Sequence, residues 1–247
     1  MFTRKKQSAT VIVLVVLVVG AMLLSGLSMI GGSGGGGSSS NDDGAPAPEE
    51  GALEPLPADH PVHTLVRRDA DDPLAKGDVD APIVMIEYSD FQCPLCSRYA
   101  RTTAPQLVEE YVNTGQLRIE YRNFPIFGPE SDNAARGSWA AGRQGLFWEF
   151  YEVAYAEEVH RDSGRFTEDA VRGLAEEAGV PDLEQFTEDM NSEEAGEAVG
   201  RDAEEAYQLG VTSTPSFLIN GHPLIGAQPA DTFREAIDQL LAAEQRS

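Results

Sequence analysis

A long hydrophobic run lies close to the amino terminus. Residues 9–30 hold 22 positions without a charged side chain. As a helix at about 1.5 Å per residue they would span about 30 Å, the thickness of a bilayer's hydrocarbon core. The hydrophobic core of a cleaved signal peptide is shorter, about 7–15 residues. We therefore expect residues 9–30 to be a retained transmembrane signal anchor, preceded by a basic cytoplasmic tip at residues 1–8.

The next segment has no hydrophobic periodicity. Residues 31–61 are rich in Gly and Ser, and then in Pro and acidic residues. Such a segment buries too little apolar surface to offset the entropy of ordering, so we predict a flexible linker. Whether the anchor is retained or cleaved, the domain that follows, residues 62–247, is expected on the extracytoplasmic side of the cell membrane. Disulfide bonds form and persist in that compartment.

Strand patterns recur at four places in this domain. Residues 83–88 form an apolar run typical of a buried strand, and residues 116–124 alternate apolar and polar positions. Residues 216–220 and 223–225 are short apolar segments joined by Asn220-Gly221, a pair that favours a tight hairpin turn. We therefore expect two separate strands and, far downstream, a hairpin.

Apolar positions at helical spacing predict six helices. They cover residues 93–113, 133–159, 167–179, 182–190, 193–209 and 229–243. Pro105 predicts a kink in the first helix, and Thr167 and Asp182 are expected to cap the third and fourth. The order of strand, helix, strand, helical block, hairpin and helix predicts an α/β fold with a helical insertion at about residues 130–209.

The charge balance is strongly acidic. The chain has 41 Asp and Glu against 18 Lys and Arg, a formal net charge of -23. This field repels phosphate backbones, so binding to nucleic acid is excluded. The two cysteines are too few for a disulfide-stapled scaffold or a four-sulfur metal site. The four histidines are scattered without ligand spacing, so we predict no metal site.

Both cysteines lie in one motif, Cys93-Pro94-Leu95-Cys96, directly after the predicted buried strand. Pro is favoured at the first position of a helix, which places Cys93 at the N-cap and Cys96 on the same face. Unpaired N–H groups and the helix dipole stabilise a thiolate at Cys93, and a stabilised thiolate makes the disulfide an oxidant. A purely structural disulfide would close too short a loop to stabilise the fold. The motif therefore predicts a redox-active disulfide and no separate cofactor.

The residues around this motif resemble a known family. Residues 80–96 and 210–221 look like those of the DsbA-like thiol:disulfide oxidoreductases of the thioredoxin superfamily, in their membrane-anchored Gram-positive form. The resemblance covers about residues 62–245 and implies a thioredoxin fold with a helical insertion. It also implies that Cys93 is the nucleophile and that Cys96 resolves the mixed disulfide.

The same resemblance implies roles for further residues. The bond before Pro215 is expected to be cis, so that the backbone of Thr214 pairs with an extended substrate peptide; an ordinary trans proline is the alternative. Pro94 and Leu95 are expected to contact the substrate. Glu87, inside the buried strand, is expected to move the proton of the buried thiol, and its alternative is a carboxylate that faces solvent.

Three functions fit these residues. The first is an oxidase that donates its disulfide to exported proteins and is re-oxidised by a membrane quinone-linked protein, a partner implied by the resemblance alone. The second is a reductase or isomerase kept reduced by a membrane electron donor. The third is a redox-inactive binding or chaperone module, against which the intact cysteine pair argues. Leu95 stands where the best-known oxidants of the family carry His, so we expect a milder oxidant. No segment resembles a dimerisation domain, so we expect a monomer.

Overall fold

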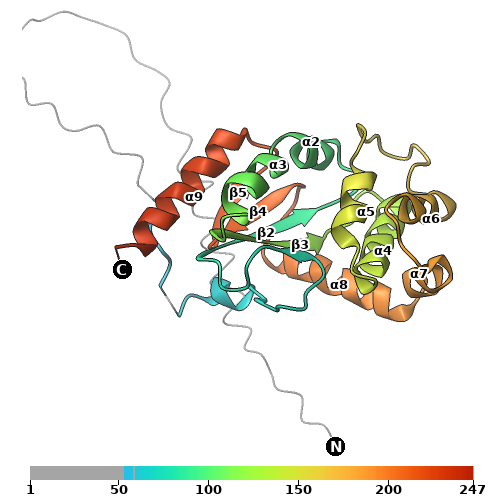
Figure 1. Ribbon diagram of the computed structural model, residues 1–247, viewed down its shortest axis with the longest axis horizontal. Coiled ribbons are helices and arrows are strands. Elements are labelled where there is room, and N and C mark those ends of the chain that lie inside the picture. Colours follow the sequence, from blue (N-terminus) through green and yellow to red (C-terminus); the bar gives the residue numbers. More distant parts are fainter. Residues whose placement is uncertain (1–52, 58, 247) are drawn as a thin grey trace, which may run out of the picture.

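The computed structural model describes residues 53–57 and 59–246 (Figure 1). The predicted tip and anchor, residues 1–8 and 9–30, lie outside these residues, as does most of the predicted linker. Within the described ranges no helix is both long and apolar enough to cross a membrane. Contacts with the domain begin before residue 62, because the Leu53 N–H donates to Gln239 Oε1 at 2.8 Å.

A five-stranded mixed sheet lies at the centre of the domain, in the order β1-β3-β2-β4-β5 (Figure 1). The strands are β1 (Ala75–Lys76), β2 (Ile83–Ser89), β3 (Leu117–Asn123), β4 (Ser216–Ile219) and β5 (His222–Ile225). β2 and β3 are parallel, and the other neighbouring pairs are antiparallel. The strand and hairpin predictions are therefore confirmed, whereas β1 is too short to show a period in the sequence.

The hairpin and the central strand follow from local sequence. Asn220 and Gly221 have φ of +44° and +88°, the left-handed pair that a two-residue hairpin turn requires. Every residue of β2 is buried, because β2 lies in the middle of the sheet with helices on both faces. Its residues alternate between those faces, so Glu87 and Ser89 share one face and Tyr88 lies on the other.

Helices cover both faces of the sheet (Figure 1). One face is covered by α2 (Pro94–Thr102), α3 (Ala104–Leu107) and α9 (Ala230–Glu244), and the other by α8 (Glu193–Gln208). The helix expected at 93–113 is confirmed in its extent, but the kink expected at Pro105 is a break two positions earlier. The chain is divided at Thr103, Pro105 lies in the first turn of α3, and a π-helical segment (Val108–Val112) follows. In a first turn the missing N–H of proline removes no helical hydrogen bond.

A helical insertion separates β3 from β4, as predicted. Its elements before α8 are α4 (Pro129–Arg143), α5 (Phe147–Ala154), α6 (Glu168–Glu177) and α7 (Leu183–Met190). The single helix expected at 133–159 is wrong, because Gly145 adopts φ +75° and divides it into α4 and α5. That conformation cannot continue a right-handed helix, and glycine adopts it at no steric cost.

The two predicted caps differ. Asp182 caps α7, because its carboxylate accepts the Gln185 N–H at 2.9 Å. Thr167 occupies the N-cap position of α6, but its side chain makes no capping bond and its hydroxyl donates to the Gly164 carbonyl at 3.2 Å. The cap prediction is therefore confirmed for Asp182 and wrong for Thr167.

A buried cluster of charged side chains on β3 binds the segment before β1 to the sheet. The Glu120 carboxylate accepts hydrogen bonds from Arg118 Nε at 3.1 Å, from Arg122 Nη2 at 2.9 Å, and from the N–H groups of Arg67 at 3.0 Å and Arg68 at 2.9 Å. Burial alone would raise the pKa of Glu120, but these backbone donors and the Arg122 guanidinium hold it below its usual range.

Candidate active site

The cysteine motif lies where the buried strand β2 leads into α2. Cys93 is the N-cap of α2, and Pro94 occupies the first turn. The Ser97 N–H donates to the Cys93 carbonyl at 3.1 Å and closes that turn. Cys96 lies within the same turn and is fully buried, while Cys93 is 3% exposed. The predicted N-cap position of Cys93 is thus confirmed.

The loop before β4 faces Cys93. The Thr214–Pro215 peptide bond is cis, which confirms that prediction. The Cys93 thiol donates to the Thr214 carbonyl at 3.2 Å, and both cysteines are free thiols. The Thr214 hydroxyl is buried and has no hydrogen-bond partner while Cys93 is a thiol, and it can donate to the sulfur when Cys93 is a thiolate. The loop therefore presents a carbonyl that accepts from the thiol and a hydroxyl that can donate to the thiolate.

The two sulfurs differ strongly in acidity. A hydrogen bond from the Cys96 thiol lowers the pKa of Cys93 to about 6, against the opposing effect of burial. The Thr214 hydroxyl and the N–H groups of Cys96 and Leu95 lower it further. Burial, and then the neighbouring Cys93, raise the pKa of Cys96 well above its ordinary value. At pH 7 Cys93 is accordingly a thiolate and Cys96 a thiol.

Cys93 is the more acidic of the two cysteines, as the sequence predicts, but the main cause of its acidity differs from the predicted one. The sequence predicts this acidity from the amino end of the helix, whose N–H groups do contribute. The Cys96 thiol, however, contributes more than those groups do. A hydrogen bond to a charged sulfur is stronger than one between neutral groups. The position of Cys96 therefore controls the acidity of Cys93.

Glu87 lies in the core on the face of β2 that α2 covers. Its side chain is 1% exposed, so the alternative of a solvent-facing carboxylate is wrong. Burial raises the pKa of Glu87 to about 8, while the nearby hydroxyls of Ser89 and Tyr151 oppose the shift. Glu87 is therefore mostly protonated at pH 7. Its role in moving the proton of Cys96 stays a prediction.

Hydroxyl groups surround this carboxyl. Among the described residues, the buried oxygen atoms without a hydrogen-bond partner include Glu87 Oε1, Ser89 Oγ and the hydroxyls of Tyr99, Tyr121 and Tyr151. Burial raises the pKa of all three tyrosines, and Glu87 raises them further. Since buried polar groups are normally paired with protein or ordered water, this cluster is a polar region inside an apolar core.

Of the three residues expected to contact substrate, Pro94 and Leu95 lie at the surface, whereas the Thr214 side chain is buried. Pro94 is exposed, and Leu95 is 47% exposed, which is rare for a large hydrophobic residue in this domain. The Leu95 side chain offers Cys93 no polar hydrogen. Contact of Pro94, Leu95 and Thr214 with a substrate stays a prediction.

Two polar residues just before Cys93 belong to the site and are missed by the sequence argument. Asp90 is 1% exposed and Gln92 is fully buried. Burial raises the pKa of Asp90, although four hydrogen bonds to its carboxylate oppose the shift. One signal in the sequence could have found them. Both residues lie next to Phe91 and just before Cys93, and polar residues within a buried run need hydrogen-bond partners.

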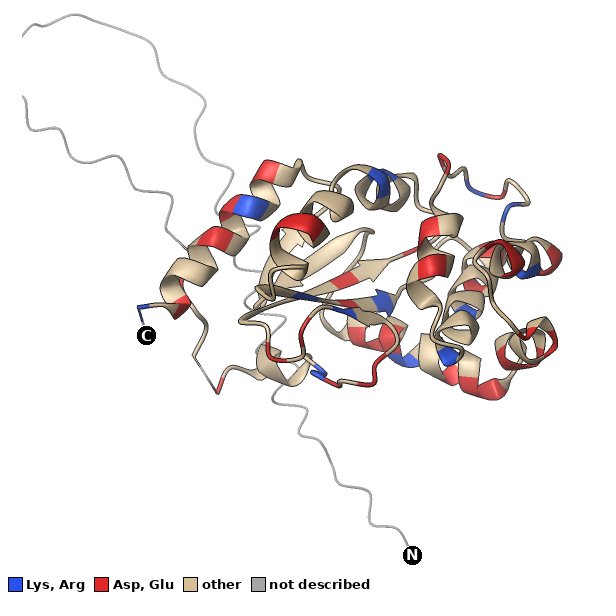
Figure 2. Ribbon diagram, in the orientation of Figure 1, with Lys and Arg blue, Asp and Glu red and all other residues tan. Residues whose placement is uncertain are grey.

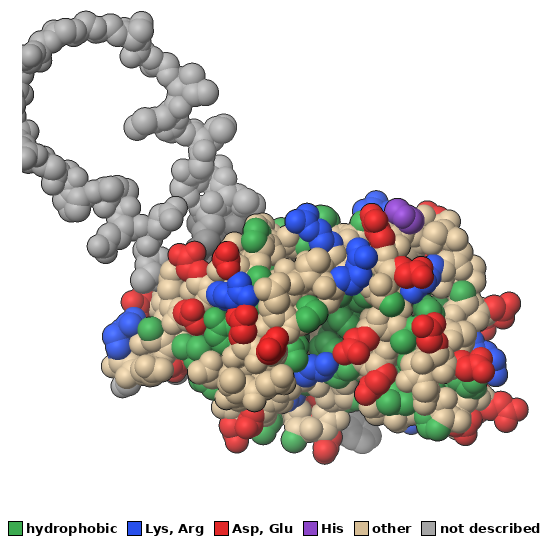
Figure 3. Space-filling view, turned by 45° about the horizontal axis from the view of Figure 1, so that its top comes forward, with side chains coloured by type: hydrophobic (Ala, Val, Ile, Leu, Met, Phe, Trp, Pro, Cys, Tyr) green, Lys and Arg blue, Asp and Glu red, His purple; other side chains and the backbone are tan. Residues whose placement is uncertain are grey.

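Acidic residues outnumber basic ones along the described chain (Figure 2). On the face shown in Figure 3, hydrophobic side chains line a hollow whose rim carries charges.

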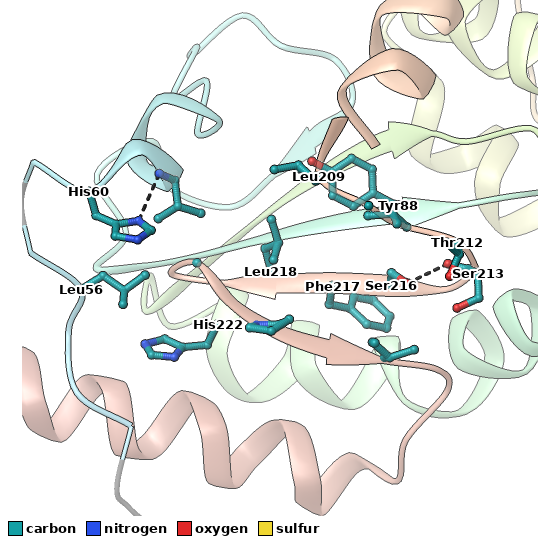
Figure 4. Close-up of a pocket in the computed structure, with 16 residues that line it drawn as sticks. Leu56, His60, Tyr88, Leu209, Thr212, Ser213, Ser216, Phe217, Leu218 and His222 are labelled. Atoms are coloured by element: carbon teal, nitrogen blue, oxygen red, sulfur yellow. Dashed lines mark hydrogen bonds between the residues drawn. The ribbon is translucent and has the colours of Figure 1, made fainter. Parts of the chain in front are cut away.

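A separate apolar pocket, drawn in Figure 4, has a volume of about 160 Å³ and reaches Thr212 and Ser213, and neither cysteine lines it. The described residues contain no group of three His, Cys, Asp or Glu side chains that could hold a metal ion.

Comparison with known proteins identifies relatives of the domain. A family model described as thioredoxin matches residues 69–239. A Bacillus cereus protein named "Probable disulfide bond formation protein D" is 34% identical over 169 residues, which are 67% of this chain and 77% of that protein. A Na(+)/H(+) antiporter, NhaA 1 of Salinispora arenicola, is 27% identical over 183 residues, but these cover 26% of the antiporter.

Solved structures share the fold. The oxidised BdbD of Bacillus subtilis has a TM-score of 0.64 at 21% identity, over 70% of this chain and 94% of that chain. A thioredoxin-like oxidoreductase from Silicibacter pomeroyi DSS-3 has a TM-score of 0.61 at 29% identity, over 71% and 95%. The alpha-DsbA1 of Wolbachia pipientis has a TM-score of 0.60 at 25% identity, over 70% and 93%.

Proposed function

This chain belongs to the thioredoxin family and is a thiol:disulfide oxidoreductase, and we propose that it acts as an oxidase that donates the Cys93–Cys96 disulfide to exported proteins during oxidative folding. The observation that carries the proposal is the position of Cys93, which is the N-cap of α2 and contacts the Thr214 carbonyl at the cis bond before Pro215; in this position its pKa falls to about 6. A sulfur that is stable as a thiolate is a good leaving group. The reduced pair is therefore favoured, and its disulfide is readily passed on.

The exchange takes two steps. A substrate thiolate attacks Cys93 Sγ of the oxidised pair, the bond between Cys93 and Cys96 breaks, and Cys96 leaves with the electron pair of that bond. Glu87, protonated at pH 7 because its pKa is about 8, supplies the proton that Cys96 takes up and regains one from solvent. A second substrate thiolate then attacks the substrate sulfur of the mixed disulfide and releases Cys93 as a thiolate.

Electrons and protons balance over these steps. Two electrons pass from the substrate dithiol to the cysteine pair, and the substrate gains one disulfide. The substrate dithiol loses two protons. Cys96 gains one proton, and the other stays in solvent because Cys93 ends as a thiolate. The Thr214 backbone, with Pro94 and Leu95, would hold the substrate peptide extended beside the pair.

The proposal places the domain outside the cytoplasm on a membrane anchor. The hydrophobic run at residues 9–30 and the disulfide formation protein among the relatives support this placement. A membrane quinone-linked protein would re-oxidise the pair by accepting its two electrons. Labelling of Cys93 in intact cells with a membrane-impermeant thiol reagent, after reduction of the Cys93–Cys96 disulfide and combined with membrane fractionation, tests the placement; protection of the reduced Cys93 until lysis would contradict it.

The equilibrium of the cysteine pair with a glutathione buffer tests the direction of transfer. An oxidase should have a reduction potential more positive than about −200 mV, within the range between glutaredoxins and DsbA. A value near −270 mV, the range of thioredoxin, would instead support the second candidate, a reductase kept reduced by a membrane donor. The exposed Leu95 favours a potential below that of the strongest oxidants, since it adds no donor or positive charge beside the thiolate.

A further inference from the structure

Gln92 joins three separate segments at the base of the cysteine motif. The side chain is fully buried, and both of its ends are bonded. Its Nε2 donates to the Phe127 carbonyl at 3.2 Å and to Ser131 Oγ at 3.0 Å. Its Oε1 accepts the N–H of Asp162 at 2.6 Å. One side chain next to Cys93 thus ties the loop before α4 to the loop after α5.

Asp90 forms hydrogen bonds in the same region, and we call Gln92, Asp90 and their bonding partners the junction. Its carboxylate accepts the Gln92 N–H at 2.7 Å, the Ser131 hydroxyl at 2.7 Å, and the N–H groups of Ile126 at 2.6 Å and Phe127 at 3.2 Å. Because the Asp90 side chain is buried, these four bonds hold the loop before α4 rigidly. Gln92 is the member of this junction that also reaches the loop after α5.

The two loops that the junction joins, residues 126–128 and 157–162, lie beside the cysteine pair, and we call them the wall. On one side the Cys93 thiol contacts the Thr214 carbonyl. On another, the loop after α5 follows the start of α2, because the Ser97 hydroxyl donates to the Glu157 carbonyl at 3.0 Å. Arg161 in this loop lies over the Phe127 ring, 3.4 Å from its centre. The loop before β4 and the loop after α5 therefore both contact the start of α2, where the cysteine pair lies.

We propose that Gln92 is a positioning residue for protein substrates, which fixes the wall formed by residues 126–128 and 157–162 beside the cysteine pair. The proposal rests on the exchange chemistry above and extends it to substrate binding. If Gln92 did not hold the two loops, a bound peptide would have to order them. The loss of the loops' conformational entropy would then weaken peptide binding. A small thiol contacts little beyond Cys93 Sγ and needs the wall less.

The test compares two thiols of different size on one oxidised enzyme. Rate constants for reduction of the Cys93–Cys96 disulfide are measured with glutathione and with an unfolded peptide that carries two cysteines. Q92M removes both ends of the bridge at similar volume. We expect it to lower the ratio of the peptide rate constant to the glutathione rate constant about five- to tenfold, mainly through KM for the peptide.

A matched control is available in the same insertion. Gln144 also bridges two backbone groups, since its Nε2 donates to the Asp182 carbonyl at 2.8 Å and its Oε1 accepts the Asp182 N–H at 3.1 Å. It lies at the end of α4 and contacts none of the site residues described above. Q144M should leave the ratio of rate constants at the wild-type value.

A second variant keeps the test decisive if Q92M does not fold. S131A removes the hydroxyl that bonds both Gln92 and Asp90, and it should lower the ratio in the same direction by a smaller factor. Equal loss with both thiols, or no change in the ratio, would overturn the proposal. Failure of the wild-type disulfide to react with either thiol would refute the proposed function as well, so the two failures are distinguishable.

Discussion

Replacement of Cys96 should raise the pKa of Cys93 by an amount that depends on the group left behind. The Cys96 thiol is the largest single cause of the acidity of Cys93. C96A removes this hydrogen-bond donor and leaves the cis loop and the helix N–H groups in place. C96S keeps a donor at the same site. Because Cys96 is fully buried, water does not readily replace the lost donor.

The size of the shift follows from the strength of the lost bond. A hydrogen bond to a charged group contributes about 1.5–3 kcal/mol, and one pKa unit corresponds to about 1.4 kcal/mol. C96A should therefore move the pKa of Cys93 from about 6 to about 7–8. At pH 7 the thiolate fraction would fall from about nine-tenths to between about one-tenth and one-half. In C96S the pKa should stay within about half a unit of the wild type.

Absorbance of the thiolate near 240 nm during a pH titration measures this directly. Each variant has one cysteine, so the midpoint belongs to Cys93, and the denatured variant supplies the ordinary value. Near-UV circular dichroism at each pH checks that the fold persists. A C96A midpoint that remains near 6 would refute the reasoning, because the helix terminus and Thr214 would then suffice. Equal shifts in C96A and C96S would point to packing rather than to the donor.

Three further changes test other parts of the molecule. C93S should abolish oxidation of dithiols, whereas C96S should accumulate mixed disulfides with substrates, visible as reducible adducts on gels; absence of adducts would contradict the order of attack. E87Q should flatten the pH dependence of stability: the folded pKa of Glu87 is raised from 4.5 to about 8, so the folded protein holds a proton that the unfolded chain releases, and the wild type loses stability as pH rises between these values. Urea unfolding at pH 5 and pH 8 measures that loss, and an equal loss in E87Q would rule out this assignment. E120A should lower the free energy of unfolding by about 3–5 kcal/mol, because it leaves buried Arg118 without a carboxylate partner and leaves Arg122 with Glu205 alone. E152A, which removes an exposed carboxylate 3.8 Å from Lys76, should change it by less than about 1 kcal/mol, and similar losses in both would show that the buried cluster is not the cause.

The fold was predictable where local pattern and burial agree. The apolar run of β2, the alternation of β3 and the Asn220-Gly221 turn each predict their structure without reference to the rest of the chain. The break between α4 and α5 was not predictable in this way. Apolar positions keep helical spacing across Gly145, so periodicity alone continues the helix through a glycine that adopts the left-handed region.

The site was predictable in its reacting atoms and not in their surroundings. Two cysteines three apart at the start of a helix indicate a redox pair, because their spacing and the helix terminus act locally. Asp90 and Gln92 carry no comparable signal. Their partners lie 35 to 70 positions away in the chain, and a polar residue in a buried run shows a need for hydrogen bonds without showing where they come from.

From the sequence alone one can predict which sulfur atoms react and that they follow a buried strand, since neighbours in the chain are neighbours in space at a strand–helix junction. Tertiary structure alone decided how acidic each sulfur is, that Glu87 is buried and protonated, and that two distant loops form a wall beside Cys93. Acidity and substrate access depend on burial and on contacts between segments far apart in the chain, and those exist only after the sheet and the insertion have packed together.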